Sequence, residues 1–188
     1  PYHLIETSTK IADDGLTYEK LDEEEREQYE DEFCEDDGLV DHIPPEKINT
    51  YIFNRDTVDI MISDLMNHGI KHKNGNHVGK TIIFAQNKRH AKYIIERFDV
   101  LYPQYKGAFC KLVVCDEPYA EKNLEDFKKP DEYPFITVTV DMLETGVDVP
   151  EITNLVFAKK VYSRIKFEQM IGRGTRLCEN LFGEGRDK

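Results

Sequence analysis

Short apolar segments that alternate with amphipathic segments constrain the fold of this chain more than any other feature. Runs rich in β-branched and aromatic residues occur at 81–85 (TIIFA), 109–115 (FCKLVVC), 135–140 (FITVTV) and 154–158 (NLVFA). Helical patterns follow them at 88–98, at 120–128 and within 166–176. Strands that alternate with helices form βαβ units. The pattern therefore predicts an α/β fold with a mainly parallel sheet.

The front of the chain differs from the rest in charge. Residues 1–46 hold 17 acidic and 3 basic side chains, whereas residues 47–188 hold 20 acidic and 22 basic side chains. The acidic run at 21–37 is typical of a solvated helix or a disordered stretch; the alternative is that it mimics nucleic acid or docks on a basic partner. Pro44-Pro45 marks a boundary. We therefore predict an acidic extension or linker over 1–45 and a domain over 46–188 that opens with an amphipathic helical region at 46–68.

Composition excludes several classes of protein. The chain has 188 residues, of which 39% are hydrophobic, and no apolar run is long enough to span a bilayer. No secretory signal pattern is visible, and the four cysteines form no Cys-x-x-Cys pair. We expect reduced thiols, a cytoplasmic location, no membrane partner and no metal bound by this chain's own side chains.

Gly79-Lys80-Thr81 resembles the end of a phosphate-binding P-loop. The P-loop requires four residues between its first glycine and Gly-Lys-Thr, and it leads from a strand into a helix. Here Gly75 lies one residue too close, and Lys80-Thr81 leads into a predicted strand. We therefore expect no phosphate site at this position, because no helix N-terminus follows to hold the phosphate.

Two arginines near the C-terminal end carry the strongest chemical signal. They lie in Gln169-Met170-Ile171-Gly172-Arg173-Gly174-Thr175-Arg176. Their spacing of three predicts that both guanidinium groups share one face of a helical turn. Arginine stays charged and offers a planar fork of donors that matches phosphate oxygens, so the pair suits a polyphosphate. An ordinary surface pair that contacts carboxylates is the alternative.

The sequence before the arginines adds specificity. A strand, a turn over 141–150 that ends in Gly146-Val147-Asp148-Val149-Pro150, a second strand and the arginine segment follow in that order. This block resembles motifs V and VI of the superfamily 2 helicases and translocases. Together with the run GKTIIFAQNKRHA at 79–91, it is similar to the motor (R) subunit of type I restriction enzymes, over roughly residues 44–188.

The resemblance implies a fold and an activity. The fold would be the second RecA-like domain of a motor, a three-layer sandwich cut from a larger protein. ATP with Mg²⁺ would be held mainly by a preceding RecA-like domain of the same chain. The full protein would translocate on double-stranded DNA in a complex with methylation and specificity subunits, and this segment alone would be inactive.

The resemblance also assigns roles around the nucleotide. Arg176 would act as the arginine finger, Arg173 would support the same phosphate, and Gln169 would orient the water or the phosphate contacts. Gly172 would allow close backbone approach. In the preceding turn, Gly146 would let the chain bend toward the nucleotide and Asp148 would accept hydrogen bonds from ribose. A turn cap is the alternative role for Asp148.

Nucleic-acid contacts are less clearly assigned. Asn87 could touch a phosphate of the tracked strand, although a helix N-cap fits equally well. Relatives often carry Thr or Ser directly before the Asp that opens the fifth motif, where this chain has Val140. Thr139 lies one step earlier, on the other face of the strand. Basic residues that follow could supply part of the contact, or form a solvated loop: Lys159, Lys160, Arg164 and Lys166.

Two other functions remain open from the sequence. One is the motor half of another superfamily 2 helicase, acting in DNA repair or on RNA. The other is a non-catalytic protein-binding RecA-like module, against which the intact Gln169, Arg173 and Arg176 speak. No carboxylate-and-lysine nuclease motif is visible.

Overall fold

The computed structural model describes residues 16–17, 42–43, 54–115, 117–140, 149–182, 185 and 187. The chain divides into two compact units, Pro1–Asp64 and Leu65–Lys188. In the first unit, β1 (Leu16–Thr17) pairs antiparallel with β2 (His42–Ile43). Within the described residues, no helix has the length and apolarity needed to cross a membrane.

Helix α3 (Arg55–His68) runs across the boundary between the units. Asn54 begins it, because its side-chain oxygen accepts hydrogen bonds from the backbone N–H and the hydroxyl of Thr57, at 2.9 and 2.8 Å. This helix confirms the later part of the helical region predicted at 46–68. Residues 46–53 lie outside the described residues.

The second unit is built on a four-stranded parallel sheet in the order β4-β5-β3-β6. The strands are β3 (Lys80–Ala85), β4 (Cys110–Leu112), β5 (Ile136–Thr139) and β6 (Ile152–Ala158). Strand β3 pairs with β5 on one side and β6 on the other, and all six of its residues are buried. A central parallel strand is covered on both faces, which explains the apolar run at 82–85.

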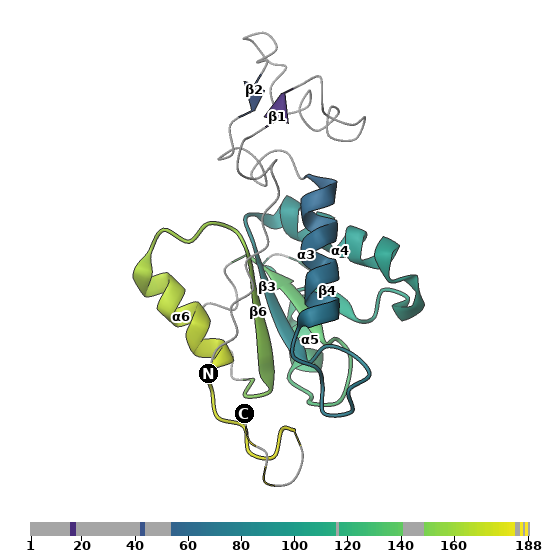
Figure 1. Ribbon diagram of the computed structural model, residues 1–188, viewed down its shortest axis with the longest axis vertical. Helices are drawn as coiled ribbons and strands as arrows, with labels where there is room; N and C mark the ends of the chain where they lie inside the picture. Colours follow the sequence, from purple (N-terminus) through teal and green to yellow (C-terminus); the bar gives the residue numbers. More distant parts are fainter. Residues whose placement is uncertain are drawn as a thin grey trace. The chain divides into compact units, whose positions relative to one another are not determined.

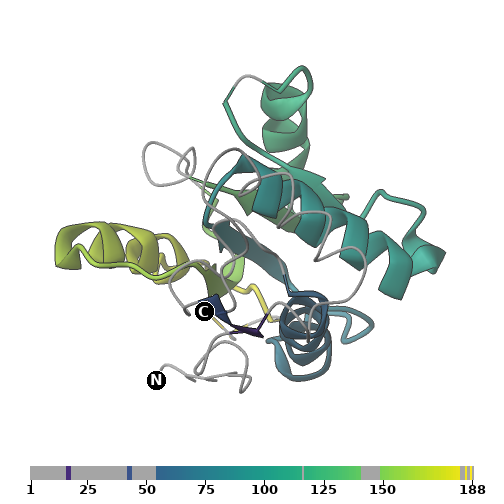
Figure 2. The ribbon, with the colours of Figure 1, turned by 90° about the horizontal axis from the view of Figure 1, so that it is seen from above.

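Helices flank this sheet. They are α4 (Lys88–Leu101), α5 (Ala120–Phe127) and α6 (Arg164–Gly174), with the short 3₁₀ helix η2 (Pro103–Tyr105) after α4. Helix α4 contacts β3, β4 and β5, α5 contacts β4, and α6 contacts β6. In both ribbon views α6 lies beside β6, away from α4 (Figure 1, Figure 2).

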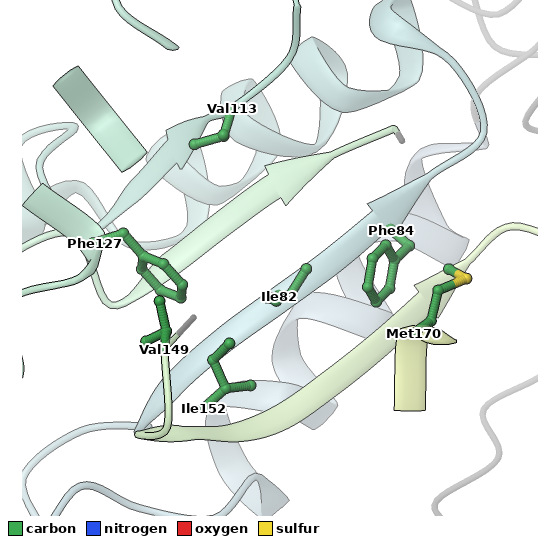
Figure 3. Close-up of a cluster of buried hydrophobic side chains, with 7 residues drawn as sticks. All are labelled: Ile82, Phe84, Val113, Phe127, Val149, Ile152 and Met170. Carbon is green, nitrogen blue, oxygen red and sulfur yellow. The ribbon is translucent and has the colours of Figure 1, made fainter. Parts of the chain in front are cut away.

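A cluster of buried side chains joins the sheet to α5 and α6 (Figure 3). Ile82 and Phe84 of β3 supply its centre, and Phe84 also stacks on Phe157 of β6 with ring centroids 5.4 Å apart. Phe127 enters from α5 and Met170 from α6. Because one cluster receives side chains from both helices and the central strand, the position of α6 is tied to the sheet.

The predicted α/β fold with a RecA-like parallel sheet is confirmed. Boundaries differ by a few residues: β4 covers only part of the run predicted at 109–115, and β6 begins two residues before 154. Helix α6 begins at Arg164, because the Ser163 hydroxyl oxygen accepts a hydrogen bond from the Lys166 N–H at 3.4 Å.

Candidate functional site

Helix α6 carries the predicted phosphate-binding residues. Met170 is fully buried in the core cluster, whereas the neighbouring Gln169 and Gly172 are exposed. The helix therefore has one face fixed to β6 and one face turned away from the domain. The resemblance places its functional residues on this second face or at the end of the helix.

The two arginines do not share a helical turn. Arg173 lies in the last turn of α6, whereas Arg176 lies beyond its end at Gly174 and the cap Thr175. The prediction of a common helical face is therefore wrong. Glycine weakens a helix, and Gly172 and Gly174 fall within its last three residues. Both arginine side chains are half-buried.

The two glycines of this segment serve different purposes. A Cβ at Gly174 would come within 2.9 Å of Leu155 Cδ1 and 3.1 Å of Leu155 Cγ, so this glycine lets the helix end approach β6. A Cβ at Gly172 would meet nothing within 4 Å. Gly172 therefore has no packing role inside the domain, and any close approach there comes from outside it. Gly174 was missed from the sequence, although the Gly-x-Gly spacing was the available signal.

The turn to which the resemblance assigns contacts with the nucleotide and its ribose is described only at its ends. Gly146 and Asp148 lie outside the described residues. At the exit of the turn, Val149 is buried in the core cluster. At its entrance, the ammonium of Lys159 donates a hydrogen bond to the carbonyl oxygen of Val140 at 2.7 Å. Lys159 was predicted to contact nucleic acid, and nothing in the sequence pointed to this backbone partner.

Asn87 caps helix α4. Its side-chain oxygen accepts a hydrogen bond from the His90 N–H at 2.8 Å, which is the alternative role considered from the sequence. His90 is buried, and its Nδ1 lies 3.3 Å from the backbone N–H of Gln86. Burial lowers the pKa of His90 to about 4, so the neutral ring accepts this hydrogen bond at neutral pH.

A cluster of charged side chains that the sequence did not predict lies near this cap. Glu117 accepts hydrogen bonds from Lys88 at 2.8 Å and from Lys92 at 2.9 Å. The pKa of Glu117 is lowered, first by the hydrogen bond from Lys88 and then by that from Lys92. The spacing of four between the lysines was visible in the sequence, but their shared partner was not.

Thr139 is fully buried at the end of β5. Its hydroxyl has no hydrogen-bond partner among the described residues. This burial argues against the predicted contact with a nucleic-acid phosphate. A side chain that solvent does not reach cannot be contacted by nucleic acid bound at the surface.

Cations and apolar side chains alternate on the surface before and along α6. Lys160, Arg164 and Lys166 are exposed, and Arg164 forms an ion pair with Glu168 at 2.8 Å. Tyr162 and Ile165 are 86% and 70% exposed. An exposed ion pair contributes little to stability, so Arg164 stays available for another anion.

The P-loop look-alike serves the fold. Lys80 is 1% exposed, and its ammonium donates hydrogen bonds to the carbonyl oxygens of Glu132 and Pro134, each at 2.8 Å. The ammonium also lies 4.7 Å from the ring centroid of Phe135. A Cβ at Gly79 would come within 2.4 Å of Thr153 Oγ1. Gly79 and Lys80 therefore join strands to a loop. This structural role is consistent with the sequence, which predicts no phosphate site here.

The described residues place three of the predicted site residues near the end of α6. They are two half-buried arginines and an exposed glycine, and arginine offers donors that suit phosphate oxygens. Lys80 offers no P-loop, because its ammonium is enclosed by carbonyl groups. In the part of the chain that the structure describes, no group of three or more His, Cys, Asp or Glu side chains could hold a metal ion.

Comparisons with known proteins identify the family of this chain. The family described as helicase conserved C-terminal domain matches residues 57–178. The endonuclease subunit of type I restriction enzyme EcoKI, from Escherichia coli (strain K12), is 42% identical over 110 residues, which cover 54% of this chain and 9% of the relative. The EcoAI endonuclease subunit from Escherichia coli is 31% identical over 111 residues, which cover 57% of this chain and 14% of the relative.

One solved structure supports the fold and the relationship. It is a fragment described as an HsdR subunit of a type I restriction enzyme from Vibrio vulnificus YJ016, with a TM-score of 0.59 and 28% identity. The match covers 69% of this chain and 26% of that one. This chain therefore spans a small part of the length of the relatives it matches. It belongs to the family of helicase conserved C-terminal domains and is related to the R subunits of type I restriction enzymes.

Proposed function

We propose that residues 46–188 are the second motor domain of an ATP-dependent translocase that moves on double-stranded DNA, as part of a type I restriction endonuclease R subunit. The family match and the two restriction relatives support this proposal. The observation that carries it is the end of α6, where Arg173 and Arg176 are half-buried beside Gly172, which has open space around it.

The chemistry of the arginines suits phosphate. Bound ATP, held with Mg²⁺ mainly by a preceding RecA-like domain, would supply the phosphoanhydride bond whose cleavage drives movement. Arg176 would offer its fork of donors to the γ-phosphate as the arginine finger, Arg173 would add a second fork, and Gln169 would orient the water. Gly172 would let a nucleotide or domain approach the backbone, while Gly146 and Asp148 would contact the nucleotide from the turn.

The DNA would be held by charges near the start of α6. Lys160, Arg164 and Lys166 are exposed there and can each meet one phosphate. Asn87 caps α4 through its side-chain oxygen, and its side-chain NH2 would be the group that donates to a phosphate. Residues 1–45 would link this domain to the preceding one, and methylation and specificity subunits would complete a cytoplasmic restriction complex.

The test replaces Arg176 in the intact motor protein. We expect Arg176→Ala to lower DNA-stimulated ATP hydrolysis by roughly 10³- to 10⁵-fold, the range measured for arginine fingers, with folding and DNA affinity retained. Steady-state hydrolysis at saturating DNA measures this loss. Arg97→Ala is the matched control, because Arg97 is also half-buried but lies on α4.

Normal turnover by Arg176→Ala would exclude the finger role. An intact wild-type protein that hydrolyses no ATP in the presence of DNA would favour the protein-binding module instead.

A further inference from the structure

Two large apolar side chains lie uncovered at the start of α6. Tyr162, directly before the capping residue Ser163, is 86% exposed, and Ile165 in the first turn is 70% exposed. Figure 1 shows the segment from β6 to α6 as an open loop beside the sheet. Scattered exposed apolar residues need no explanation, whereas these two are concentrated within four residues.

The described residues do not cover Tyr162 in the usual way. An apolar residue that precedes a helix cap often packs on the fourth residue of the helix, which here is Phe167. Phe167 instead packs on Phe157 of β6, with ring centroids 5.4 Å apart. Tyr162 stays exposed, so its ring remains accessible for contact with another molecule.

The apolar pair, Tyr162 and Ile165, lies among cations. The exposed cations of this segment are Lys160, Arg164 and Lys166. Residues 160–167 hold no acidic side chain, and Glu168, the next residue, is ion-paired with Arg164 at 2.8 Å. The segment therefore carries a net positive charge, which favours an anionic partner.

A second exposed tyrosine shows what distinguishes this surface. Tyr119 is 69% exposed at the start of α5, so it resembles Tyr162 in residue type and in its place at a helix start. Its charged neighbours in the sequence are acidic, Glu117 and Glu121. Exposure of a tyrosine alone therefore does not make a surface for an anion, and the cations beside Tyr162 supply the difference.

The combination of cations and apolar side chains fits nucleic acid better than protein. Lysine is depleted from the cores of protein interfaces, whereas cations beside aromatic side chains are typical of surfaces that bind both the phosphates and the bases of nucleic acid. Phosphates border each groove of a duplex. Apolar side chains placed between phosphate-binding cations therefore reach sugar and base atoms in the groove.

We infer that Tyr162 and Ile165 make an apolar contact with double-stranded DNA: they pack against sugar and base atoms in a groove, while Lys160 and Arg164 meet the bordering phosphates. The inference rests on the proposed function for the choice of DNA as the partner. It adds a part of the DNA affinity that does not depend on salt, because apolar contacts release no counterions.

The test compares Tyr162→Ala with Tyr119→Ala in the intact motor protein. The probe is a short fluorescein-labelled duplex of mixed sequence, and anisotropy measures its affinity across a salt series without ATP. We expect Tyr162→Ala to weaken binding by roughly 5- to 100-fold at every salt concentration, as the loss of one aromatic contact with a base does. The salt slope should stay at the wild-type value. Tyr119→Ala should bind as the wild type does.

Three further variants identify the kind of contact. Tyr162→Phe keeps the ring and should retain most of the affinity, which separates a ring contact from a hydroxyl bonded to phosphate. Ile165→Ala should weaken binding less than Tyr162→Ala, with the same slope. Lys160→Met should reduce the salt slope by about 0.9, the value for one lost phosphate contact. Circular dichroism should match the wild type throughout, because these side chains are exposed.

The outcomes separate the apolar contact from the motor function. Wild-type affinity in both Tyr162→Ala and Ile165→Ala would overturn the inference and leave the motor function in place. Equal losses in Tyr162→Phe and Tyr162→Ala would assign the contact to the hydroxyl and overturn it as well. Normal DNA affinity with lost binding of the methylation or specificity subunits would make the apolar pair a protein-docking surface instead.

The wild type itself decides the remaining cases. A wild type that binds no duplex DNA would reject both the inference and the proposed function. A wild type that binds the duplex but hydrolyses no ATP would reject the motor, and weaker binding by Tyr162→Ala would then still support the apolar contact.

Discussion

The two edges of the central sheet each hold a lysine whose ammonium donates to backbone carbonyl groups. At the amino-terminal edge, Lys80 is 1% exposed and bonds to two carbonyl oxygens from one loop. At the carboxyl-terminal edge, Lys159 is half-buried, and its ammonium donates a hydrogen bond to the carbonyl oxygen of Val140. Ligands of parallel α/β sheets bind beyond the carboxyl ends of the strands.

Similar lysine contacts therefore have different roles at the two edges of the sheet. At the amino-terminal edge, the ammonium of Lys80 is covered by the rings of Phe127 and Phe135 and bonded to carbonyl groups. The carboxyl-terminal edge keeps charged side chains at the surface, including Lys160. We therefore expect substitutions at the first edge to change stability and substitutions at the second to change activity.

The largest effect on the free energy of unfolding is expected at Lys80, where a substitution tests the role of the amino-terminal edge in stability. We expect Lys80→Met to lower the free energy of unfolding by about 2 kcal/mol, because two carbonyl groups lose their donor while the stem stays packed. Chemical denaturation followed by circular dichroism measures the change. Lys73→Met is the control, because Lys73 is 47% exposed in its pair with Asp131 and should change stability little.

Lys80 also makes the free energy of unfolding depend on pH. Burial lowers the pKa of Lys80 from 10.5 to about 8. Between these values the unfolded chain binds more protons than the folded chain, so the Lys80 contribution makes the free energy of unfolding rise with pH. Lys80→Met should lose this rise between pH 8 and 10.5. A variant that keeps the same rise as the wild type would show that another group causes it.

A smaller effect separates the two glycines of α6. Gly174→Ala should lower the free energy of unfolding by about 1 kcal/mol, because the new methyl group would press on Leu155. Gly172→Ala should raise it by up to about 1 kcal/mol, the usual gain in helix propensity. If Gly172 faces a nucleotide or another domain, the stabilised variant should still hydrolyse ATP more slowly.

Thermal unfolding and DNA-stimulated hydrolysis, measured on both glycine variants, check this prediction. Equal loss of stability in the two variants would contradict the separate roles of Gly172 and Gly174.

The smallest effect concerns Thr139. Its buried hydroxyl has no partner among the described residues, so Thr139→Val should leave the free energy of unfolding unchanged or raise it by up to about 1 kcal/mol. DNA affinity across a salt series should match the wild type. A weaker affinity with a smaller salt slope would return Thr139 to the DNA-contacting residues and weaken the contrast between buried strand ends and exposed cations.

The fold could be predicted because its signals are local. Strand β3 is apolar along almost its whole length, as a central parallel strand requires, and the P-loop look-alike was excluded by spacing within a few residues. The sequence left two roles for Asn87, a phosphate contact and a helix N-cap. In the structure Asn87 caps α4 by accepting a hydrogen bond from the His90 N–H, three residues along the chain.

The features of the site that the sequence did not predict depend on contacts between residues far apart in the sequence. Lys159 meets Val140 only because the strand order brings the ends of β5 and β6 to the same edge, on either side of β3. A Cβ at Gly174 would press on Leu155 of β6, and the periodic pattern of the helix predicted within 166–176 could not show this contact. Packing between separated segments decided both features.

The position of β3 between β5 and β6 also has a consequence for synthesis of the chain. Both partners of β3 come later in the sequence, and β5 begins only at Ile136. During translation, β3 leaves the ribosome long before either neighbour exists, and pairing between distant segments is slow. Its backbone groups can be paired on both sides only after Ala158 has emerged. A ribosome that stalls before that residue would expose an apolar strand with open edges, which is the kind of segment that chaperones must shield from aggregation.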